Sequence, residues 1–575
     1  MVLYCVYIEL YYYSNYNTNR FFDPEENLNY YKNFSVDNNV LYLVYNNKCR
    51  IPNLDIYNPD VLPFMKKRKF RPCTDKGGQL TYIQTVGNQN TLIIDYTKRN
   101  YYAIYGKISC CYSVVHRRKH NDNSYLIDNC THFEKTAVLN STIQFLIVKC
   151  ERVFRNGRKK IVYAKAHAII TTKHKIRKRL DSFKQNDTTQ PISVLMIVFD
   201  SVSRLNFYRA MPKTANYILS KGWFPLRAFN KVGLNTYPNI MAMMTGYNIS
   251  QVQVKCNNRN PKRLDKCPLI LYKYRGNGYV TAYGEDDSSI NSFSYAGPGF
   301  LVKPTDYYIH QSLNDVSLQD SQTKLMFNNL ENSGLFNKSI VIFMSDHGMR
   351  FGGYRKTYSG WLEDRLPFIF IWLPDWFRKK FPTAVKNLKL NENRLTTAFD
   401  LHLTLQDILK KSGRLKEATP SLACPKCKSL FEEIPFERGC EDASIDFEWC
   451  TCNGFHSIDN NIFGIDGVAE ILVKRIQKIL SKSSETRKLC KKPSLKSVID
   501  VRESQLSTAT VKFYLVTIEI DPSGKFEGTI VKTFIKGKNS FELKGDVTRI
   551  DSYGTQSHCI HTKYYKPYCY CKEKL

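Results

Sequence analysis

Two apolar runs of this 575-residue chain end in acidic side chains that could do chemistry. ISVLMIVFD ends in Asp200, and SIVIFMSDHG contains Asp346 followed at once by His347. Such runs are typical of parallel strands buried on both faces, and ligands of parallel sheets bind beyond the carboxyl ends of the strands. Two carboxylates and an imidazole there would suit a divalent cation, and Zn²⁺ accepts this mixture of N and O donors. The alternative is a helix cap at Asp200 and a turn formed by Asp346 with Gly348.

The stretch GLNTYPNIMAMMTGYN places a hydroxyl, Thr236, before what resembles a helix start. Pro238 suits the first helical turn, so Thr236 lies at or beside the N-cap, where backbone N–H groups and the helix dipole favour negative charge. A threonine hydroxyl is a poor nucleophile unless a base or a metal lowers its pKa. Between a dipole and a cation, Thr236 could attack phosphorus or sulfur. An ordinary helix cap is the alternative.

The elements that must position these side chains alternate between strand and helix over residues 191–415. Further strand candidates are YVTAYGED and RLPFIFIWLP, and helix candidates are MPKTANYILSKG and TTAFDLHLTLQDILKKSG. This order predicts an α/β domain with a mostly parallel sheet. Residues 1–190 alternate apolar and polar residues as a β-rich, cysteine-containing region would, and end in a charged stretch that is a plausible linker. Residues 416–575 form a cysteine-rich region with a helix, GVAEILVKRIQKILSKSSE, and late strands.

The 18 cysteines are concentrated on both sides of a cysteine-free middle. This distribution favours disulfide-braced flanks, an oxidising compartment and an extracellular or secretory location. The first 20 residues lack the basic n-region and cleavage site of a signal peptide, so the N-terminus is interpreted as incomplete. No stretch reaches about 18 uncharged apolar residues, so no spanning helix is expected.

The net charge of +32 favours anionic partners but does not choose among nucleic acid, anionic lipid and sulfated glycan. A nucleic-acid alternative would take the basic linker as a binding segment, with Cys424, Cys427, Cys450 and Cys452 as a zinc knuckle. The basic residues lie in a linker-like stretch and a clean second Cys-x2-Cys is missing, so nucleic acid is not the expected partner.

At Thr236, Pro238, Asn239, Thr245 and Gly246 the chain resembles the nucleophile segment of nucleotide pyrophosphatase/phosphodiesterases, within the alkaline phosphatase/sulfatase superfamily. SDHGM and FDSVSR are similar to the metal-binding motifs of that superfamily. A closer resemblance, from NKCRIPNLDIYNP to the terminal YCYC, is to an animal family known as a domain of unknown function. The resemblance implies an alkaline-phosphatase-like α/β/α sandwich with a mostly parallel central sheet.

The resemblance also implies site residues. Asp200, Thr236, Asp346 and His347 would surround one metal, with Zn²⁺ as the expected ion and Thr236 as nucleophile. A second metal would draw on Asp306 and His310, in the Asp-x3-His spacing of phosphodiesterases, and on His402. In the family a longer segment separates the elements that carry Asp306 and His310, whereas in this chain the two elements nearly abut. A shortened or degenerate chain would explain this difference. Asn239 would bind substrate.

Two arginines after the Asp-His pair, Arg350 and Arg355, could hold an anionic substrate through bidentate hydrogen bonds, or could simply be solvated surface charges. Threonine in place of cysteine disfavours formylglycine sulfatase chemistry. We therefore expect a hydrolase or transferase of phosphate esters, less readily of sulfate esters, with an anionic small molecule, lipid or glycan as substrate. The alternative is a secreted, catalytically inactive member of the fold that acts as a binding or structural module.

Overall fold

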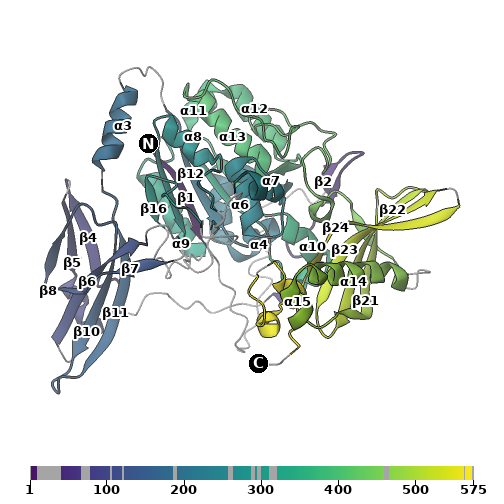
Figure 1. Cartoon of the computed structure of the whole chain (residues 1–575). Coiled ribbons are helices and arrows are strands. Elements are labelled where there is room, and N and C mark those ends of the chain that lie inside the picture. The colour runs from purple at the N-terminus through teal and green to yellow at the C-terminus, as the bar shows by residue number, and fades with distance from the viewer. Residues whose placement is uncertain are drawn as a thin grey trace.

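The computed structural model describes residues 2–8, 41–65, 78–87, 89–103, 107–118, 122, 124–171, 173–184, 191–256, 263–285, 292–293, 299–309, 320–458, 465–535, 537–562 and 564–572. Figure 1 shows a β-rich body built from residues of the first third, a central body of helices and strands, and a body of late strands and helices. The predicted mixture of α and β structure is confirmed, with several separate sheets.

The central sheet holds the strands that end in Asp200 and Asp346. Its order is β13-β18-β17-β12-β1-β15-β16. The strands from β17 to β16 pair in parallel, whereas β18 is antiparallel to both β17 and β13. The bounds are β1 (Val2–Ile8), β12 (Ser193–Phe199), β13 (Phe224–Pro225), β15 (Val280–Glu285), β16 (Tyr307–Ile309), β17 (Ser339–Ser345) and β18 (Ile369–Trp372).

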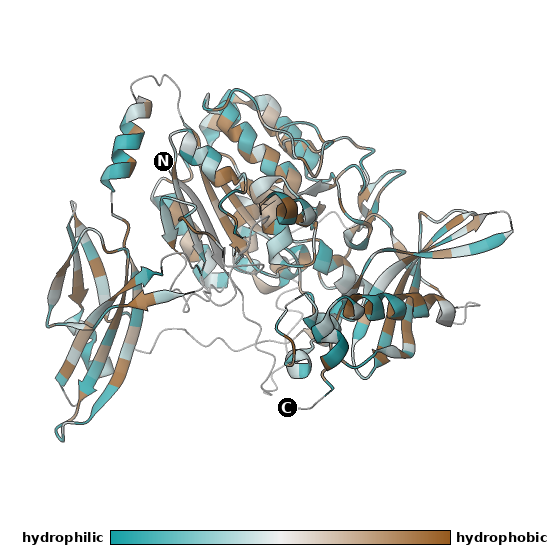
Figure 2. Ribbon diagram, viewed as in Figure 1, coloured by the Kyte–Doolittle hydropathy of each residue, from teal (hydrophilic) through white to brown (hydrophobic). Residues whose placement is uncertain are grey.

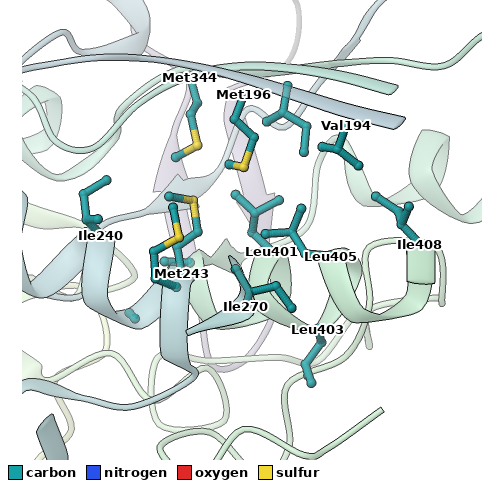
Figure 3. Close-up of a cluster of buried hydrophobic side chains, with 14 of the residues drawn as sticks. Val194, Met196, Ile240, Met243, Ile270, Met344, Leu401, Leu403, Leu405 and Ile408 are labelled. Atoms are coloured by element: carbon teal, nitrogen blue, oxygen red, sulfur yellow. The ribbon is translucent and has the colours of Figure 1, made fainter. Parts of the chain in front are cut away.

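Helices cover both faces of this sheet. The even-numbered residues of β12 from Val194 to Val198 are buried in one cluster with α6, α8 and α13, and the odd-numbered ones from Leu195 to Phe199 in another with α4, α5 and α9. Figure 3 shows Val194 and Met196 facing Leu401 and Leu405. Burying each such side chain contributes about 1.5–3 kcal/mol. Figure 2 shows that the most hydrophobic ribbon lies in this central body.

The helices of the central body follow the sequence signals closely. α5 ends before Gly222, as predicted, and α13 begins with a capping box in which Thr397 and Asp400 exchange hydrogen bonds. The bounds are α4 (Arg204–Ala210), α5 (Pro212–Ser220), α6 (Thr236–Thr245), α7 (Ile249–Lys255), α8 (Ile270–Gly276), α9 (Asp320–Asn332), α10 (Tyr358–Arg365), α11 (Asp375–Lys380), α12 (Pro382–Asn391) and α13 (Ala398–Lys411), with the short strands β14 (Phe229–Asn230) and β19 (Thr396–Thr397).

The β-rich body consists of a sheet β11-β10-β6-β7, with β8 also on β6, and a sheet β4-β5-β9, which share one buried core. The bounds are β4 (Thr81–Val86), β5 (Gln89–Ile94), α2 (Arg99–Tyr102), β6 (Lys107–Arg117), β7 (Tyr125–Ile127), β8 (Thr131–Phe133), β9 (Thr136–Leu139), β10 (Phe145–Val153) and β11 (Lys159–Ala168). The first strand of the chain, β1, lies instead in the central sheet between β12 and β15. Residues 1–190 are therefore not one body.

The charged stretch that was expected to be a linker contains a helix, α3 (His174–Lys184). Ile176 is buried, and Arg179 forms an ion pair with Asp306 of the central body. The helix forms because its few apolar residues recur at helical spacing and face a partner, while its many basic residues stay in water.

The late body packs α14 and α15 against the sheet β20-β21-β22-β23-β24. The bounds are β20 (Phe455–Ser457), α14 (Ile465–Ser481), α15 (Ser484–Leu489), β21 (Ser494–Ser504), β22 (Val511–Asp521), β23 (Lys525–Ile535) and β24 (Lys538–Arg549). A hairpin of β2 (Tyr42–Tyr45) and β3 (Arg50–Pro52) shares a buried cluster with Trp361 of α10 and Leu515 of β22. Early, central and late parts of the sequence thus share one core there.

Sixteen cysteines pair in disulfides, as the cysteine distribution predicted. The pairs are Cys49–Cys452, Cys110–Cys150, Cys111–Cys130, Cys256–Cys267, Cys424–Cys427, Cys440–Cys450, Cys490–Cys569 and Cys559–Cys571. The four cysteines of the zinc-knuckle alternative are all among them, so they offer no thiolate to a metal. In the part of the chain that the structure describes, no helix is both long and apolar enough to cross a bilayer.

Candidate metal centre

The two acids of the candidate centre are neighbours because their strands are neighbours. β12 and β17 pair in parallel and in register, with Phe199 opposite Ser345. Asp200 and Asp346 are the next residues along each chain, so both leave the sheet at its carboxyl edge, as the sequence predicted. Asp346 is fully buried, and Asp200 is partly accessible.

Thr236 reaches this pair from the start of α6. The N-cap is Asn235, whose side chain makes no capping hydrogen bond, and Thr236 is the first helical residue. Its hydroxyl donates to Asp200 Oδ1 at 3.2 Å and lies 3.5 Å from His347 Nε2. The Thr236 hydroxyl is therefore directed at the acidic pair and does not cap its own helix.

The imidazole of His347 completes the group. Nε2 lies 3.6 Å from Asp200 Oδ1 and 3.4 Å from Asp346 Oδ2, and the three candidate donor atoms lie within 4.8 Å of one another. Nδ1 is 2.7 Å from the carbonyl oxygen of Gly348, which can only accept a hydrogen bond, so Nδ1 carries the proton. Nε2 is left with its lone pair directed toward the carboxylates.

Ser201 contacts both acids of the centre, and the sequence analysis did not single it out. It has a φ of 60°, a left-handed conformation that non-glycine residues adopt at a cost of about 1 kcal/mol or more. This conformation lets its backbone N–H donate to Asp346 Oδ1 at 3.1 Å, while its hydroxyl donates to Asp200 Oδ1 at 3.0 Å. Its position directly after a strand-ending aspartate was the available signal.

Burial dominates the electrostatics of the centre. It raises the pKa of Asp200, and the charge of Asp346 raises it further, whereas His347 and Arg350 oppose the shift. Burial likewise raises the pKa of Asp346, against hydrogen bonds from Thr236 and from the backbone of Ser201 and His347. Burial lowers the pKa of His347 to about 4, so the ring is neutral at physiological pH.

The chemistry of this donor set fits a divalent cation. Burial and mutual repulsion disfavour two charged carboxylates so close together while His347 is neutral, and a divalent cation would offset their charge. The free Nε2 lone pair and the carboxylate oxygens are ligands that Zn²⁺ accepts. The two groups of cysteines with similarly close sulfurs, at Cys440, Cys450, Cys452 and at Cys559, Cys569, Cys571, are committed to disulfides.

The centre lies within the part of the chain that matches a known family. Residues 66–315 and 309–499 match the family described as protein of unknown function (DUF229). These two ranges cover well over half of the chain and contain all four candidate residues. The chain belongs to the DUF229 family. No curated protein matches it.

Asp306, which the sequence analysis assigned to a second metal site, lies far from the first centre in this DUF229 member. Asp306 precedes β16 and accepts a hydrogen bond from the backbone N–H of Thr281, near the start of β15, at 2.9 Å. Leu3 of β1 pairs with Val194 of β12 on one side and with Thr281 of β15 on the other, so Thr281 and Val194 lie at the same height in the sheet. Asp200 lies six residues beyond Val194, toward the carboxyl edge. At about 3.3 Å per residue, the two acids are about 20 Å apart along the strands, at opposite edges of the sheet.

His402 is also remote from the centre. Its Nδ1 donates to the carbonyl of Met243 at 2.9 Å, and its ring packs on Gly246. At a rise of about 1.5 Å per residue, Met243 lies about 10 Å along α6 from Thr236, so His402 packs at the other end of that helix. Burial lowers the pKa of His402 to about 4. His310, the third residue of the expected second site, lies outside the described residues.

Asn239 has a positioning role rather than the substrate-binding role implied by the resemblance. Its Oδ1 accepts from the backbone N–H groups of Val232 and Gly233 at 2.8 and 3.1 Å. Its Nδ2 donates to the carbonyls of Asn235 and Gly233 at 2.8 and 3.1 Å. The buried amide thus fastens the loop that leads to Thr236.

The two candidate arginines differ. Arg355 is buried and forms a bidentate ion pair with Glu527 of β23, with distances of 3.0 and 2.6 Å, so it is committed inside the protein. Arg350 is partly exposed, with its guanidinium over the ring of Phe351 at 4.8 Å. Its charge lowers the pKa of both Asp200 and His347, so it lies within electrostatic range of the centre.

Proposed function

We propose that this DUF229 protein is a metal-dependent hydrolase or transferase of phosphate esters, with Thr236 as nucleophile. The observation that carries the proposal is the convergence of a helix-start hydroxyl with Asp200, Asp346 and His347, from three separate elements. Each residue alone has a structural explanation, but a hydroxyl that does not cap its helix and two buried acids beside a neutral imidazole fit chemistry better.

Asp200, Asp346 and His347 would hold the cation, which we take to be Zn²⁺, with Thr236 beside it. A divalent cation bound there lowers the pKa of a neighbouring hydroxyl and offsets negative charge on a phosphoryl group. Ser201 orients both carboxylates, and Gly348 fixes the imidazole tautomer. The acidic side chains of the centre would otherwise repel an anionic substrate.

In the proposed reaction the Thr236 oxygen attacks phosphorus, the bond from phosphorus to the leaving alcohol breaks, and the hydroxyl proton leaves Thr236. Asp200, which accepts the Thr236 hydrogen bond, is placed to receive that proton, and the oxygen of the leaving alcohol then takes it up. The phosphothreonine is then cleaved by water, or by an acceptor alcohol in a transferase, which restores the hydroxyl. The positive end of the α6 dipole favours the charge on the phosphoryl oxygens.

Arg350 is the residue that we assign to substrate binding, because it is accessible and its charge acts on the centre. An anionic small molecule, lipid or glycan carrying a phosphate ester fits this charge. Threonine in place of cysteine makes sulfate esters the less favoured class. The resemblance of these motifs to the alkaline phosphatase/sulfatase superfamily supports the same chemistry and an alkaline-phosphatase-like sandwich, and the disulfides support a secreted protein.

The test combines metal content with turnover. Protein produced through a secretory route should contain close to one zinc per chain by elemental analysis, and should hydrolyse a chromogenic phosphate mono- or diester. Removal of metal by a chelator should abolish turnover, and added Zn²⁺ should restore it. Protein that retains no metal and turns over no phosphate or sulfate ester would instead favour an inactive binding module.

A further inference from the structure

The late sheet inserts a carboxylate into the central body, where it meets two arginines at the ends of one short segment. Glu527, on β23, is 4% exposed. It accepts from Arg355 at 3.0 and 2.6 Å and from Nη2 of Arg365 at 2.8 Å. Arg355 comes just before α10 and Arg365 is its last residue, and this helix lies beside β23 and β24 in Figure 1.

A second carboxylate, Asp364, shares the same arginines. It lies 3.2 Å from Arg355 Nη2, 3.2 Å from Arg365 Nη1 and 2.7 Å from Lys231 Nζ. With Lys231 counted as protonated, the cluster holds three cationic and two anionic side chains, all nearly inaccessible to water, so its formal charge is 3 − 2 = +1. Burial lowers the pKa of Lys231 to about 7, against the attraction of Asp364. Burial would raise the pKa of Asp364, but Lys231 and the arginines hold it below its usual range. Loss of Glu527 would leave a buried charge of +2, which burial makes unfavourable.

Asp364 connects this cluster to the centre through its backbone. Its carbonyl accepts from the N–H of Gly348 at 3.0 Å. The two chain segments touch so closely that a Cβ on Gly348 would lie 2.0 Å from the carbonyl oxygen of Glu363. The carbonyl oxygen of Gly348 in turn accepts a hydrogen bond from Nδ1 of His347. A shift of Asp364 would therefore move the group that orients the imidazole.

Lys231 makes a second connection. It lies on the chain that leads into α6, and together with Asp346 and Asn239 it lines a small cavity behind the centre. Its ammonium also lies over the ring of Trp449 at 4.6 Å. The cluster thus supports both the loop that carries His347 and the segment that carries Thr236.

We infer that Glu527 is a positioning residue for the candidate centre: the late sheet holds His347 in place through the arginines and Asp364. The inference rests on the proposed function for its consequence in metal binding, but the positional coupling stands on these contacts alone. It gives the late body a role in positioning the site, although the candidate ligands Asp200, Asp346 and His347 all belong to the central body.

The test uses the full-length chain with Glu527→Gln. Glu519→Gln is the matched control, because Glu519 belongs to the same sheet but pairs with Lys496 at the surface. Hydrogen–deuterium exchange is followed in peptides that cover residues 340–352, and Co²⁺ binding is followed by its visible absorption. We expect faster exchange in this segment and about tenfold weaker Co²⁺ binding in Glu527→Gln only, as for other residues that orient metal ligands.

Exchange and Co²⁺ affinity that match those of Glu519→Gln would overturn the inference. If the wild-type protein takes up no Co²⁺, the proposed hydrolase fails, while exchange still decides the role of Glu527. If Glu527→Gln gives no folded protein, the double variant Arg355→Gln/Glu527→Gln takes its place, since it restores a formal charge of +1. Faster exchange than in Arg355→Gln alone supports the inference, and equal exchange contradicts it.

Discussion

Thr236, the first residue of α6, donates its hydroxyl hydrogen to Asp200 Oδ1 over 3.2 Å. A threonine at a helix start usually accepts a hydrogen bond from that helix. Here the N-cap position belongs to Asn235, and the hydroxyl faces an acid from a different strand. This relationship separates the catalytic interpretation of Thr236 from the cap interpretation.

Replacement of Thr236 should remove turnover without unfolding the protein. Because the hydroxyl is the proposed attacking group, we expect Thr236→Ala to lower kcat by at least about 1000-fold. Thr236→Ser keeps a hydroxyl at the same position and should retain measurable turnover. Steady-state kinetics with a chromogenic phosphate ester measures both variants, and circular dichroism checks the fold. Equal turnover in Thr236→Ala and the wild type would refute the assignment.

Replacement of one buried acid should abolish tight metal binding and stabilise the metal-free protein. Asp346→Asn keeps an oxygen that can accept from Ser201 and His347 but removes the charge that raises the pKa of Asp200. We expect no tight Zn²⁺ binding and, in the presence of chelator, a melting temperature above that of the metal-free wild type.

Asp306→Asn is the matched control, because Asp306 lies at the opposite edge of the same sheet and pairs with Arg179. It should bind Zn²⁺ normally and melt at a lower temperature. Calorimetric titration and thermal unfolding measure both variants. Normal Zn²⁺ affinity in Asp346→Asn would show that this acid is not a ligand.

The acid-bearing strand ends could be predicted because their signals are local. A short, mostly apolar run that ends in an acid describes a buried parallel strand and its carboxyl end, and parallel strands bring such ends together. The Asp-x3-His spacing around Asp306 gave no such information, because spacing along the chain does not fix the edge of the sheet at which a residue lies. Asp306 comes before a strand, not after one, so it stands at the amino edge, far from Asp200.

Long-range electrostatics could not be predicted. Arg355 seemed a candidate for substrate binding because it follows the Asp-His pair, but its partner Glu527 is 172 residues away in sequence. Nothing in either local sequence indicates that the two meet inside the protein. The same holds for β1, whose apolar run fits any buried strand and which pairs with strands almost 200 and 280 residues later.

Thiol counting should distinguish disulfides from zinc ligands. Sixteen of the 18 cysteines pair within the part of the chain that the structure describes, so at most 18 − 16 = 2 would react in denatured, unreduced protein. We expect a thiol reagent to count two or fewer thiols per denatured chain before reduction and 18 after reduction. Four or more additional thiols together with released zinc would restore the zinc-knuckle interpretation.

Replacement of the two arginines after the Asp-His pair should affect different properties: KM for Arg350 and the stability of the fold for Arg355. Arg350→Ala removes an accessible cation and should raise KM for a phosphate ester by about tenfold, with little change in melting temperature. Arg355→Ala breaks a buried ion pair and should destabilise the fold by about 3–5 kcal/mol. Kinetics and thermal unfolding of the two variants, side by side, measure this. A rise in KM for Arg355→Ala alone, at unchanged stability, would reverse the assignment.

Glu448 should make stability depend on pH. Burial raises its pKa to about 7, and the charges of Asp546 and Asp446 add to the shift. The folded state then binds a proton that the unfolded chain loses near pH 4.5, so this contribution is full below that pH and disappears as the pH rises through about 7. It amounts to at most about 3 kcal/mol. In Glu448→Gln the amide oxygen can still accept from the backbone of Asp546, but nothing titrates. The melting temperature of the wild type, relative to that of Glu448→Gln, should therefore fall between pH 5 and pH 8, and parallel curves for the two proteins would contradict the raised pKa.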